Sequence, residues 1–600
     1  MEKKQTWMHR IIWNKTALGI AVLHFAVSFL TDDFIFRYVK WDFSTGLQAM
    51  KSLETIAVKI VFLGLLVLLW QGLFYFFCRA KKEFRNLALF YFGIMVVLLL
   101  LTWPGIWRMD EFGLLSSSVQ LYPHWWQNYI TSVWYIFSLM LFPFPAGVIL
   151  VQIIAISLIY ARIVSNGLRE YDRKTKMKIM SENEQVDKKS AQATKNAGYI
   201  ANGEKGGRDI RRICYVVVLT IPFVMFPVLD SNLYPLRMSF YAFLELMLLS
   251  ELYFLYRRRT AVQSESEIEC DDRKVIFALV PLAAVVTVWR TEAIYYLVLF
   301  PVILLCLGGL KRYLHQILLY FIAFVILFAP QKIGEKMTSG DQYELTSVVL
   351  PLVPLVLQAQ EDGADDLLAE INLVVDTDVI SRAAAEGKNG INMFWSEPDF
   401  QRSYTSEDFA RFQSAYRKLI IRYPMIFLQE RWQTFLASTD LLENTTELFT
   451  NDEVENYVNF RKYLLNRPIS DKMRTAVIKT LEIRKSSNYE EKYPVTDWVY
   501  SPLPSILILL IACVIALAKK KRIPLVILFA AFARVPLVFL TAPSRLFMYY
   551  YSVYLIGYVL LFYLLAGQLS KKGNYSDPHS QNRCKQLPFC SCMASRHIDL

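Results

Sequence analysis

Long apolar runs recur along this chain, and they limit its possible folds more than any other feature. Inside a bilayer every backbone N–H and C=O must be hydrogen-bonded within its own segment, so a run of about 20 mostly apolar residues predicts a membrane-spanning helix. The 54% hydrophobic content exceeds the average for soluble domains, about 45–50%. Hydropathy and length predict about twelve spans, at residues 17–36, 55–77, 87–106, 146–164, 213–229, 237–256, 275–289, 293–309, 313–330, 502–518, 523–541 and 545–567. We therefore expect an all-α polytopic membrane protein.

Segment 275–309 fits either one long helix or two short helices that meet at Trp289-Arg290-Thr291-Glu292. We predict two helices, because the charges of Arg290 and Glu292 then lie at a water-accessible turn instead of inside the hydrocarbon. A single helix would also place the basic cluster 519–522 on the side opposite to the other basic clusters. The charge pattern thus supports the same division.

Lysine and arginine accumulate in cytoplasmic loops of membrane proteins. With twelve spans, every basic cluster of this chain falls on one side, together with both termini, which we predict to be cytoplasmic. The net charge of +12 then follows from topology and from attraction to anionic lipid heads, so we expect membrane lipids and no nucleic acid as partners. The clusters are 2–4, 79–82, 257–259, 311–312, 519–522 and 571–572.

The alternation of membrane spans with inward and outward loops also divides the chain into regions. We expect a mainly helical outward-facing domain at 331–500, inserted before the last three helices, in which Pro424 interrupts the helical pattern of Phe409–Ser438 and predicts two helices or a kink. The linker 165–212 is polar, and we expect it to be cytoplasmic and largely disordered. The predicted regions are 1–86 (a basic segment and two helices), 87–330 (a core with the outward loop 107–145 and the linker), 331–500, 501–570 (the last helices) and 571–600 (a cytoplasmic tail).

Motifs and cysteines that the sequence lacks also limit the class of protein. No Walker A, GxGxxG or HExxH motif occurs, so nothing indicates a nucleotide-driven pump. The outward domain 331–500 has no cysteine and hence no disulfide framework. A lysine-rich, cysteine-poor outward domain suits a bacterial envelope, so we expect a multi-pass protein of a bacterial cell membrane.

The acidic pair Asp110-Glu111 follows the third predicted span and a tryptophan-rich segment. Two adjacent carboxylates at a membrane face are costly unless they are solvated, paired or bound to a cation. Such groups can take a proton from a substrate hydroxyl or hold a metal ion. The alternative is a solvated loop start or a helix cap. We favour a functional role and predict Asp110 and Glu111 as the catalytic carboxylates.

The rest of the outward loop is rich in aromatic residues. His124 lies in Tyr122-Pro123-His124-Trp125-Trp126, and the amphipathic stretch Tyr129–Phe142 follows it. Amphipathic segments too short to span the bilayer tend to lie in its interface. We therefore expect the loop to fold back along the membrane surface, where an enzyme can meet a lipid-borne substrate.

With these features the chain resembles the GT-C superfamily of polytopic glycosyltransferases, which use polyprenyl-phosphate sugars. The resemblance covers about 87–567 and rests on Asp110-Glu111 after a membrane helix, Pro123-His124, Trp289-Arg290-Thr291-Glu292, and the late Arg545 with Tyr549-Tyr550-Tyr551. In one departure, two spans precede the helix that delivers the acidic pair, where members usually have none. Two added helices preserve the orientation of the loop.

The resemblance implies an inverting sugar transfer from a polyprenyl-phosphate donor to a glycan, lipid or protein acceptor. It implies Asp110 as general base, with Glu111 as alternative or partner. A divalent cation, Mg²⁺ or Mn²⁺, bound at this pair is a further possibility, because metal dependence varies within the superfamily. The remaining predicted substrate-binding residues are His124, Arg290, Glu292, Arg545 and Tyr549.

Each predicted binding residue also has a purely structural interpretation. His124 lies beside two tryptophans and could simply pack in the interface. Arg290 could pair with Glu292, Arg545 could snorkel at a membrane boundary, and Tyr549 could belong to an aromatic belt.

Two other functions remain open at the level of sequence. A transporter or flippase of lipid-linked or anionic cargo would explain the intramembrane charges Glu245, Glu251 and Arg534, although the chain lacks an evident inverted repeat. A glycan polymerase or ligase would also use lipid-linked substrates, and would depend more on outward arginines than on an acidic pair.

Overall fold

The computed structural model describes residues 14–36, 45–107, 109–187, 210–235, 237–260, 265–337, 345–439, 467–481 and 499–572. Within these ranges the regular elements are helices, and a single antiparallel bridge joins Val375 to Gln401. Nine helices in the described part of the chain are long and apolar enough to cross a membrane. The architecture is therefore that of an all-helical, multi-pass membrane protein, as the sequence predicts.

Every predicted span overlaps a helix, but the exact number of twelve crossings remains a prediction. A tenth crossing would come from the bent pair 210–223 and 226–232, whose halves meet at 61°. Two more predicted spans lie in α10 (Glu265–Trp289), whose start is charged, and in α22 (Leu503–Ala518), which has only 16 residues. The nine candidates are α1 (Lys15–Ile35), α2 (Gly46–Cys78), α3 (Lys82–Leu101), α6 (Ala146–Asp187), α9 (Arg237–Arg259), α11 (Tyr296–Gly308), α12 (Leu310–Met337), α23 (Arg522–Phe532) with α24 (Arg534–Thr541), and α25 (Tyr551–Lys572).

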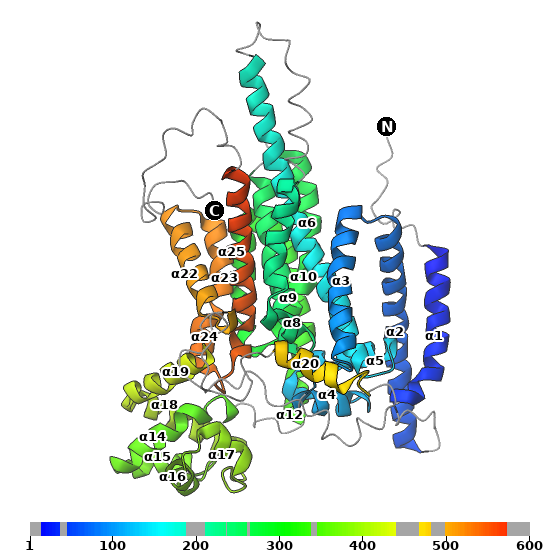
Figure 1. The fold of residues 1–600 in the computed structure, drawn as a ribbon. Coiled ribbons are helices and arrows are strands. Elements are labelled where there is room, and N and C mark those ends of the chain that lie inside the picture. The colour runs from blue at the N-terminus through cyan, green and yellow to red at the C-terminus, as the bar shows by residue number, and fades with distance from the viewer. Residues whose placement is uncertain are drawn as a thin grey trace.

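Helices α6, α9, α10 and α25 form the centre of the bundle, while α1 and α2 pair at its edge (Figure 1). The prediction of two helices at 275–309 is confirmed, because α10 ends at Trp289 and α11 begins at Tyr296. Between them Arg290 has an extended backbone and precedes a 3-10 turn, Thr291–Ala293. We call residues 289–292 the elbow.

The prediction of a largely disordered linker at 165–212 is wrong for its first part, and its residues 188–209 lie outside the described residues. Helix α6 continues without a break to Asp187 and projects from the end of the bundle (Figure 1). Lys, Arg, Glu and Met are strong helix formers, and neither Gly nor Pro interrupts residues 168–187. The ion pair of Lys174 with Glu170, four residues apart, adds to this preference.

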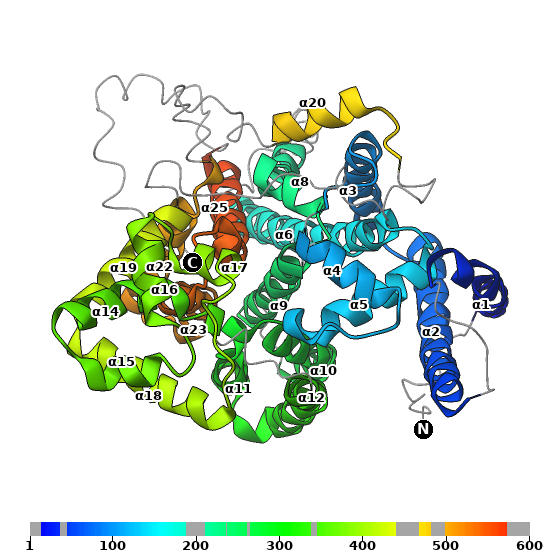
Figure 2. The same ribbon diagram turned by 90° about the horizontal axis from the view of Figure 1, so that it is seen from below.

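The segments predicted to face outward gather at the opposite end of the bundle (Figures 1 and 2). They include α4 (Met109–Ser118), α5 (Tyr129–Leu141), the last residues of α8 (Phe226–Asn232) and the elbow. The loop 107–145 does fold back across the helix ends, as its amphipathic pattern predicts. That this end faces outward and that both termini are cytoplasmic remain predictions from the basic clusters.

Residues 345–439 form a separate helical unit at this end, which we call the small domain. Its own core contains Leu352, Val356, Phe412 and Leu419. Pro424 begins its last helix, so the predicted interruption is confirmed. The helices are α14 (Val349–Glu361), α15 (Asp365–Ile371), α16 (Thr377–Ala385), α17 (Gly390–Ser396), α18 (Ser406–Arg422) and α19 (Pro424–Ser438).

The small domain does not include all of the predicted region 331–500. Helix α12 extends to Met337, so it takes the start of that region. Helix α20 (Asp471–Leu481) packs back on the bundle, where Arg474 donates hydrogen bonds to the backbone carbonyls of Thr102 and Gly105, at 3.2 and 3.0 Å. The described part of this region thus comprises the end of α12, the small domain, and α20, which lies on the bundle.

Candidate functional site

A cleft of about 650 Å³ opens at the end of the bundle that carries the small domain. Its walls come from the loop 117–128, the elbow, the end of α12 and helix α17 of the small domain. The walls are mainly aromatic, with a few cationic and polar groups directed inward. A concave apolar site with convergent polar groups is the usual form of a small-molecule binding site. The principal lining residues are Tyr122, His124, Trp125, Trp126, Arg237, Arg290, Gln331, Lys332, Glu335 and Trp395.

Asn128 and Gln331 hold the loop in place. Asn128 has a left-handed backbone, caps the start of α5 with its side-chain oxygen, and donates from Nδ2 to the Val288 carbonyl at 2.9 Å. Asparagine tolerates this backbone region better than most residues. Gln331 of α12 donates to the Trp125 carbonyl at 2.8 Å and accepts from the Tyr129 N–H at 2.9 Å. These bonds join the loop to α10 and α12, so the cleft wall is built on rigid helices.

Trp125 lies directly against Gly334 of α12. A Cβ atom added at Gly334 would lie 2.2 Å from the indole atoms Cδ2 and Cε3, which is far inside van der Waals contact. Glycine at 334 therefore allows the indole to lie flat against the helix as part of the cleft wall.

We expect Gly334→Ala to destabilise the folded protein by about 1–3 kcal/mol, because the added methyl group displaces a packed indole. The same displacement should impair ligand binding in the cleft. Gly93→Ala is the matched control, since a Cβ there meets nothing within 4 Å and alanine favours the helix. Unfolding of both variants in the same lipid–detergent mixture checks the prediction, and an equally stable Gly334→Ala protein would contradict it.

The cleft has a cationic side. Arg237 is the first residue of α9, and Arg290 lies at the elbow, where its guanidinium forms a two-point ion pair with Glu292 at 2.5 and 3.0 Å. His124 completes this side, with its ring centroid 5.9 Å from that of Trp126. The Nδ1 atom of His124 is buried and, among the described residues, has no hydrogen-bond partner. This nitrogen is therefore a candidate contact for a ligand.

His124 also places the cleft beside Asp110. A Cβ on Gly113 of α4 would lie 3.9 Å from His124 Nε2. Asp110 lies three residues before Gly113, hence on the same side of α4. The exposed Asp110 side chain occupies the first turn of that helix, where the helix dipole stabilises a negative charge. Asp110 itself does not line the cleft, but its helix turn lies beside His124, which does.

Glu111 behaves differently from its neighbour. Its side chain is buried, with 2% exposure, whereas Asp110 faces solvent. Successive residues of an α-helix point about 100° apart, so the two carboxylates do not converge. Within the described ranges no group of three or more His, Cys, Asp or Glu side chains has the arrangement of a metal site. The cation that the sequence leaves open at this pair remains a prediction, and the chemistry considered below does not depend on it.

The pKa of His124 is lowered from its ordinary value of 6.5, mainly by burial; Asp110 raises it and Arg237 lowers it. As the pH falls, the unfolded chain takes up this proton before the folded protein does. Folded-state stability should therefore be lost as the pH falls from about 6.5 toward the folded pKa. We expect wild type to lose more stability than His124→Gln between about pH 7.5 and about pH 5.5. Thermal unfolding of both proteins measures this, and parallel pH profiles would contradict it.

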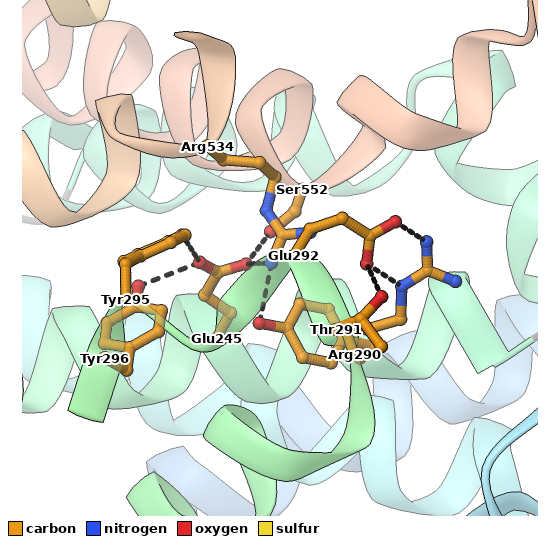
Figure 3. A network of polar contacts seen from close by, with 9 residues as sticks. Glu245, Arg290, Thr291, Glu292, Tyr295, Tyr296, Arg534 and Ser552 are labelled. Carbon is orange, nitrogen blue, oxygen red and sulfur yellow. Dashed lines mark hydrogen bonds and ion pairs between the residues drawn. The ribbon is translucent and has the colours of Figure 1, made fainter. Parts of the chain in front are cut away.

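Behind the elbow lies a buried polar network (Figure 3). Glu245 of α9 accepts hydrogen bonds from Tyr295 at 3.1 Å, from Tyr296 at 2.8 Å and from Ser552. Arg534, the first residue of α24, forms an ion pair with Glu245 at 3.1 Å and donates to the Tyr241 hydroxyl at 2.7 Å. This network connects α9, the start of α11, α24 and α25. It therefore fixes α9, which begins with Arg237, and the start of α11, which follows the elbow.

Three of the five predicted binding residues do not line the cleft. Arg545 donates to Glu430 of α19 at 3.0 Å, and the Tyr549 hydroxyl lies 3.2 Å from Ser544 Oγ. Both residues belong to the contact between the last helices and the small domain. Glu292 takes part indirectly, through its ion pair with Arg290.

Several cleft residues were not predicted as functional from the sequence. Arg237 follows the short loop 230–236, and an arginine at the outer end of a span could have been noted as a phosphate ligand. Trp395 belongs to the small domain and reaches the cleft through tertiary packing, with its ring 6.4 Å from Trp126. No local pattern indicates that contact.

No family model, no curated protein and no solved structure matches the chain.

Proposed function

We propose that the protein is a membrane glycosyltransferase that moves a sugar from a polyprenyl-phosphate donor to an acceptor at the outer face of the membrane. One observation carries the proposal. A cleft at the end of the helix bundle combines the guanidinium groups of Arg237 and Arg290 with His124 and aromatic walls, beside the helix turn that bears Asp110. The location suits a donor whose lipid tail stays in the bilayer while its phosphate and sugar enter the cleft.

Each group then has a chemical role. Guanidinium groups bind phosphate oxygens in a fork, so Arg237 and Arg290 would hold the donor phosphate and stabilise the charge that grows on it. The acceptor hydroxyl oxygen bonds to the anomeric carbon as the bond from that carbon to the phosphate oxygen breaks. Asp110 takes the hydroxyl proton. Attack opposite to the leaving phosphate inverts the anomeric centre and releases polyprenyl phosphate.

The first test is sugar transfer by purified protein in lipid vesicles. A mixture of polyprenyl-phosphate sugars and candidate acceptors is supplied, with and without a chelator, and free polyprenyl phosphate is measured. Release by the wild-type protein, and transfer of the sugar to an acceptor, are expected. Absence of release from every donor, with correctly folded protein, would contradict the proposal.

Substitutions of Arg237 and Arg545 give a sharper prediction in the same assay. Arg237→Gln should raise the KM for the donor by about 10- to 100-fold, because a hydrogen bond to a charged group contributes about 1.5–3 kcal/mol. Arg545→Gln is the control, since Arg545 binds Glu430 outside the cleft. Equal effects of the two substitutions would contradict the placement of the donor phosphate.

A glycan polymerase or ligase is the second candidate, because the cleft presents two arginines at its cationic side. Diphosphate-linked glycans supplied in the same assay separate the two functions. The transporter hypothesis relied on Glu245 and Arg534 as a pathway. Both side chains are only 1% exposed and bind each other and neighbouring hydroxyls, an arrangement that favours a structural role.

A further inference from the structure

Helix α19 of the small domain presents an apolar face to its surroundings. Ile421, at the end of α18, and Met425, Leu428 and Trp432 of α19 are between 43% and 79% exposed. Their spacing places the three α19 residues on one side of the helix. We call these four residues the apolar stripe. Exposed apolar residues that gather in one patch usually mark a surface that something covers.

The rest of α19 packs against the protein, and Thr434, Ala437 and Ser438 are buried on its side away from the stripe. Arg431 is also buried and donates to the carbonyls of Ala542, at 2.8 Å, and Ser347, at 3.2 Å. Phe435 lies at the edge of the stripe, where it stacks on Trp432 at 5.5 Å and packs against Phe539 of α24 at 6.0 Å between ring centroids. The helix is therefore fixed in orientation, and the stripe cannot turn inward to the core of the small domain.

The position of α19 indicates what covers the stripe. The helix runs nearly crosswise to the bundle, directly at the end of α24, and the other small-domain helices lie on its far side from the bundle (Figure 1). Helix α24 is the second half of a candidate membrane span that ends at Thr541, and its Leu540 is exposed toward the surroundings. The stripe therefore lies on a helix that packs against the end of a candidate membrane span.

The charged residues near the stripe are of the kind that bind a membrane surface. Arg417, Lys418 and Arg422 are exposed on α18, next to the start of α19. Helices that lie in the interface combine an apolar face containing Trp or Leu with nearby Lys and Arg, which attract anionic lipid heads. Trp432 is also the residue type most enriched at this depth.

From these observations we propose that the apolar stripe is inserted into the lipid leaflet at this end of the bundle. The insertion anchors the small domain to the membrane as well as to the bundle. Because α17 of the same domain contributes Phe394 and Trp395 to the cleft, the anchor holds one wall of the cleft in place. The inference concerns the stripe alone and does not depend on the proposed sugar transfer.

Spin labels test the proposal in the full-length protein. The eight native cysteines are replaced by serine, and single cysteines are introduced as Met425→Cys, Trp432→Cys and, as control, Ala369→Cys. Ala369 is exposed on α15, on the side of the small domain away from the bundle. Each labelled protein is reconstituted into phosphatidylcholine–phosphatidylglycerol vesicles, and collisions of the label with oxygen and with a water-soluble nickel chelate are measured.

Labels at 425 and 432 should collide often with oxygen and rarely with nickel, with a nickel-to-oxygen ratio several-fold below that at 369. Nickel collisions equal to those of the control would place the stripe in water and overturn the proposal. Low collision with both reagents would show a protein surface over the stripe, such as a second copy, and would overturn it equally. All three positions are exposed, and thermal unfolding confirms that each labelled protein is folded.

Discussion

Asp110→Asn is expected to lower the turnover of sugar transfer by about 10²- to 10⁴-fold, the usual contribution of a positioned general base. Asparagine keeps the shape of the side chain but cannot take the acceptor proton. The Arg237 and Arg290 side chains are unchanged, so the affinity for the donor should stay close to that of wild type. Single-turnover rates and donor binding, measured on the same preparation, separate the two quantities.

Glu111→Gln is the matched control for this substitution. Glu111 is adjacent in sequence, but its side chain is buried and points away from that of Asp110. We expect Glu111→Gln to reduce stability while folded molecules keep most of their turnover. The opposite result, an active Asp110→Asn and an inactive but stable Glu111→Gln, would transfer the role of base to Glu111. Full activity of both variants would exclude this acidic pair from the chemistry.

The positions of the helices could be predicted from the sequence because the bilayer imposes a length and a composition on each span. The elbow was predictable for a related reason, since Arg290 and Glu292 are costly within a helix in hydrocarbon. Pro424 fixed the break between α18 and α19 by removing a backbone donor. In each of these cases the decisive cause is local in sequence.

The helix α4 was not predicted, because its sequence offers little local preference. It contains Gly113 and three serines, 116–118, and only the packing of the loop makes it a helix. The failure matters for the site, since α4 separates the directions of Asp110 and Glu111. A sequence shows two adjacent carboxylates, whereas their convergence depends on the secondary structure around them.

Which of the binding residues lie together in the cleft could not be predicted from the sequence, for a different reason. Arg290 and Arg545 are both arginines at outer helix ends and look equivalent. Tertiary packing distinguishes them, because the small domain presents Glu430 to Arg545 and Trp395 to the cleft. Such contacts join residues more than a hundred positions apart, and no periodicity or spacing encodes them.

Arg534→Met is expected to destabilise the folded protein by about 3–5 kcal/mol, because it leaves the buried carboxylate of Glu245 without its cation. Both side chains are 1% exposed, so water cannot replace the lost partner. The hydroxyl groups of Tyr295, Tyr296 and Ser552 still donate to the carboxylate, but they cannot neutralise it. Reversible unfolding in mixed micelles, followed by circular dichroism, gives the difference in unfolding free energy.

Two companion variants show whether burial of the charge is the cause. In the Arg534→Met background, Glu245→Gln removes the lone charge, so the double variant should recover part of the lost stability. Arg212→Met removes an arginine of the same bundle whose ion pairs with Glu83 and Asp172 are partly exposed, and it should cost no more than about 1 kcal/mol. Equal costs for Arg212→Met and Arg534→Met would mean that water reaches the Glu245 network. A water-accessible charge network inside the bundle would favour the transport pathway over the structural role assigned to it here.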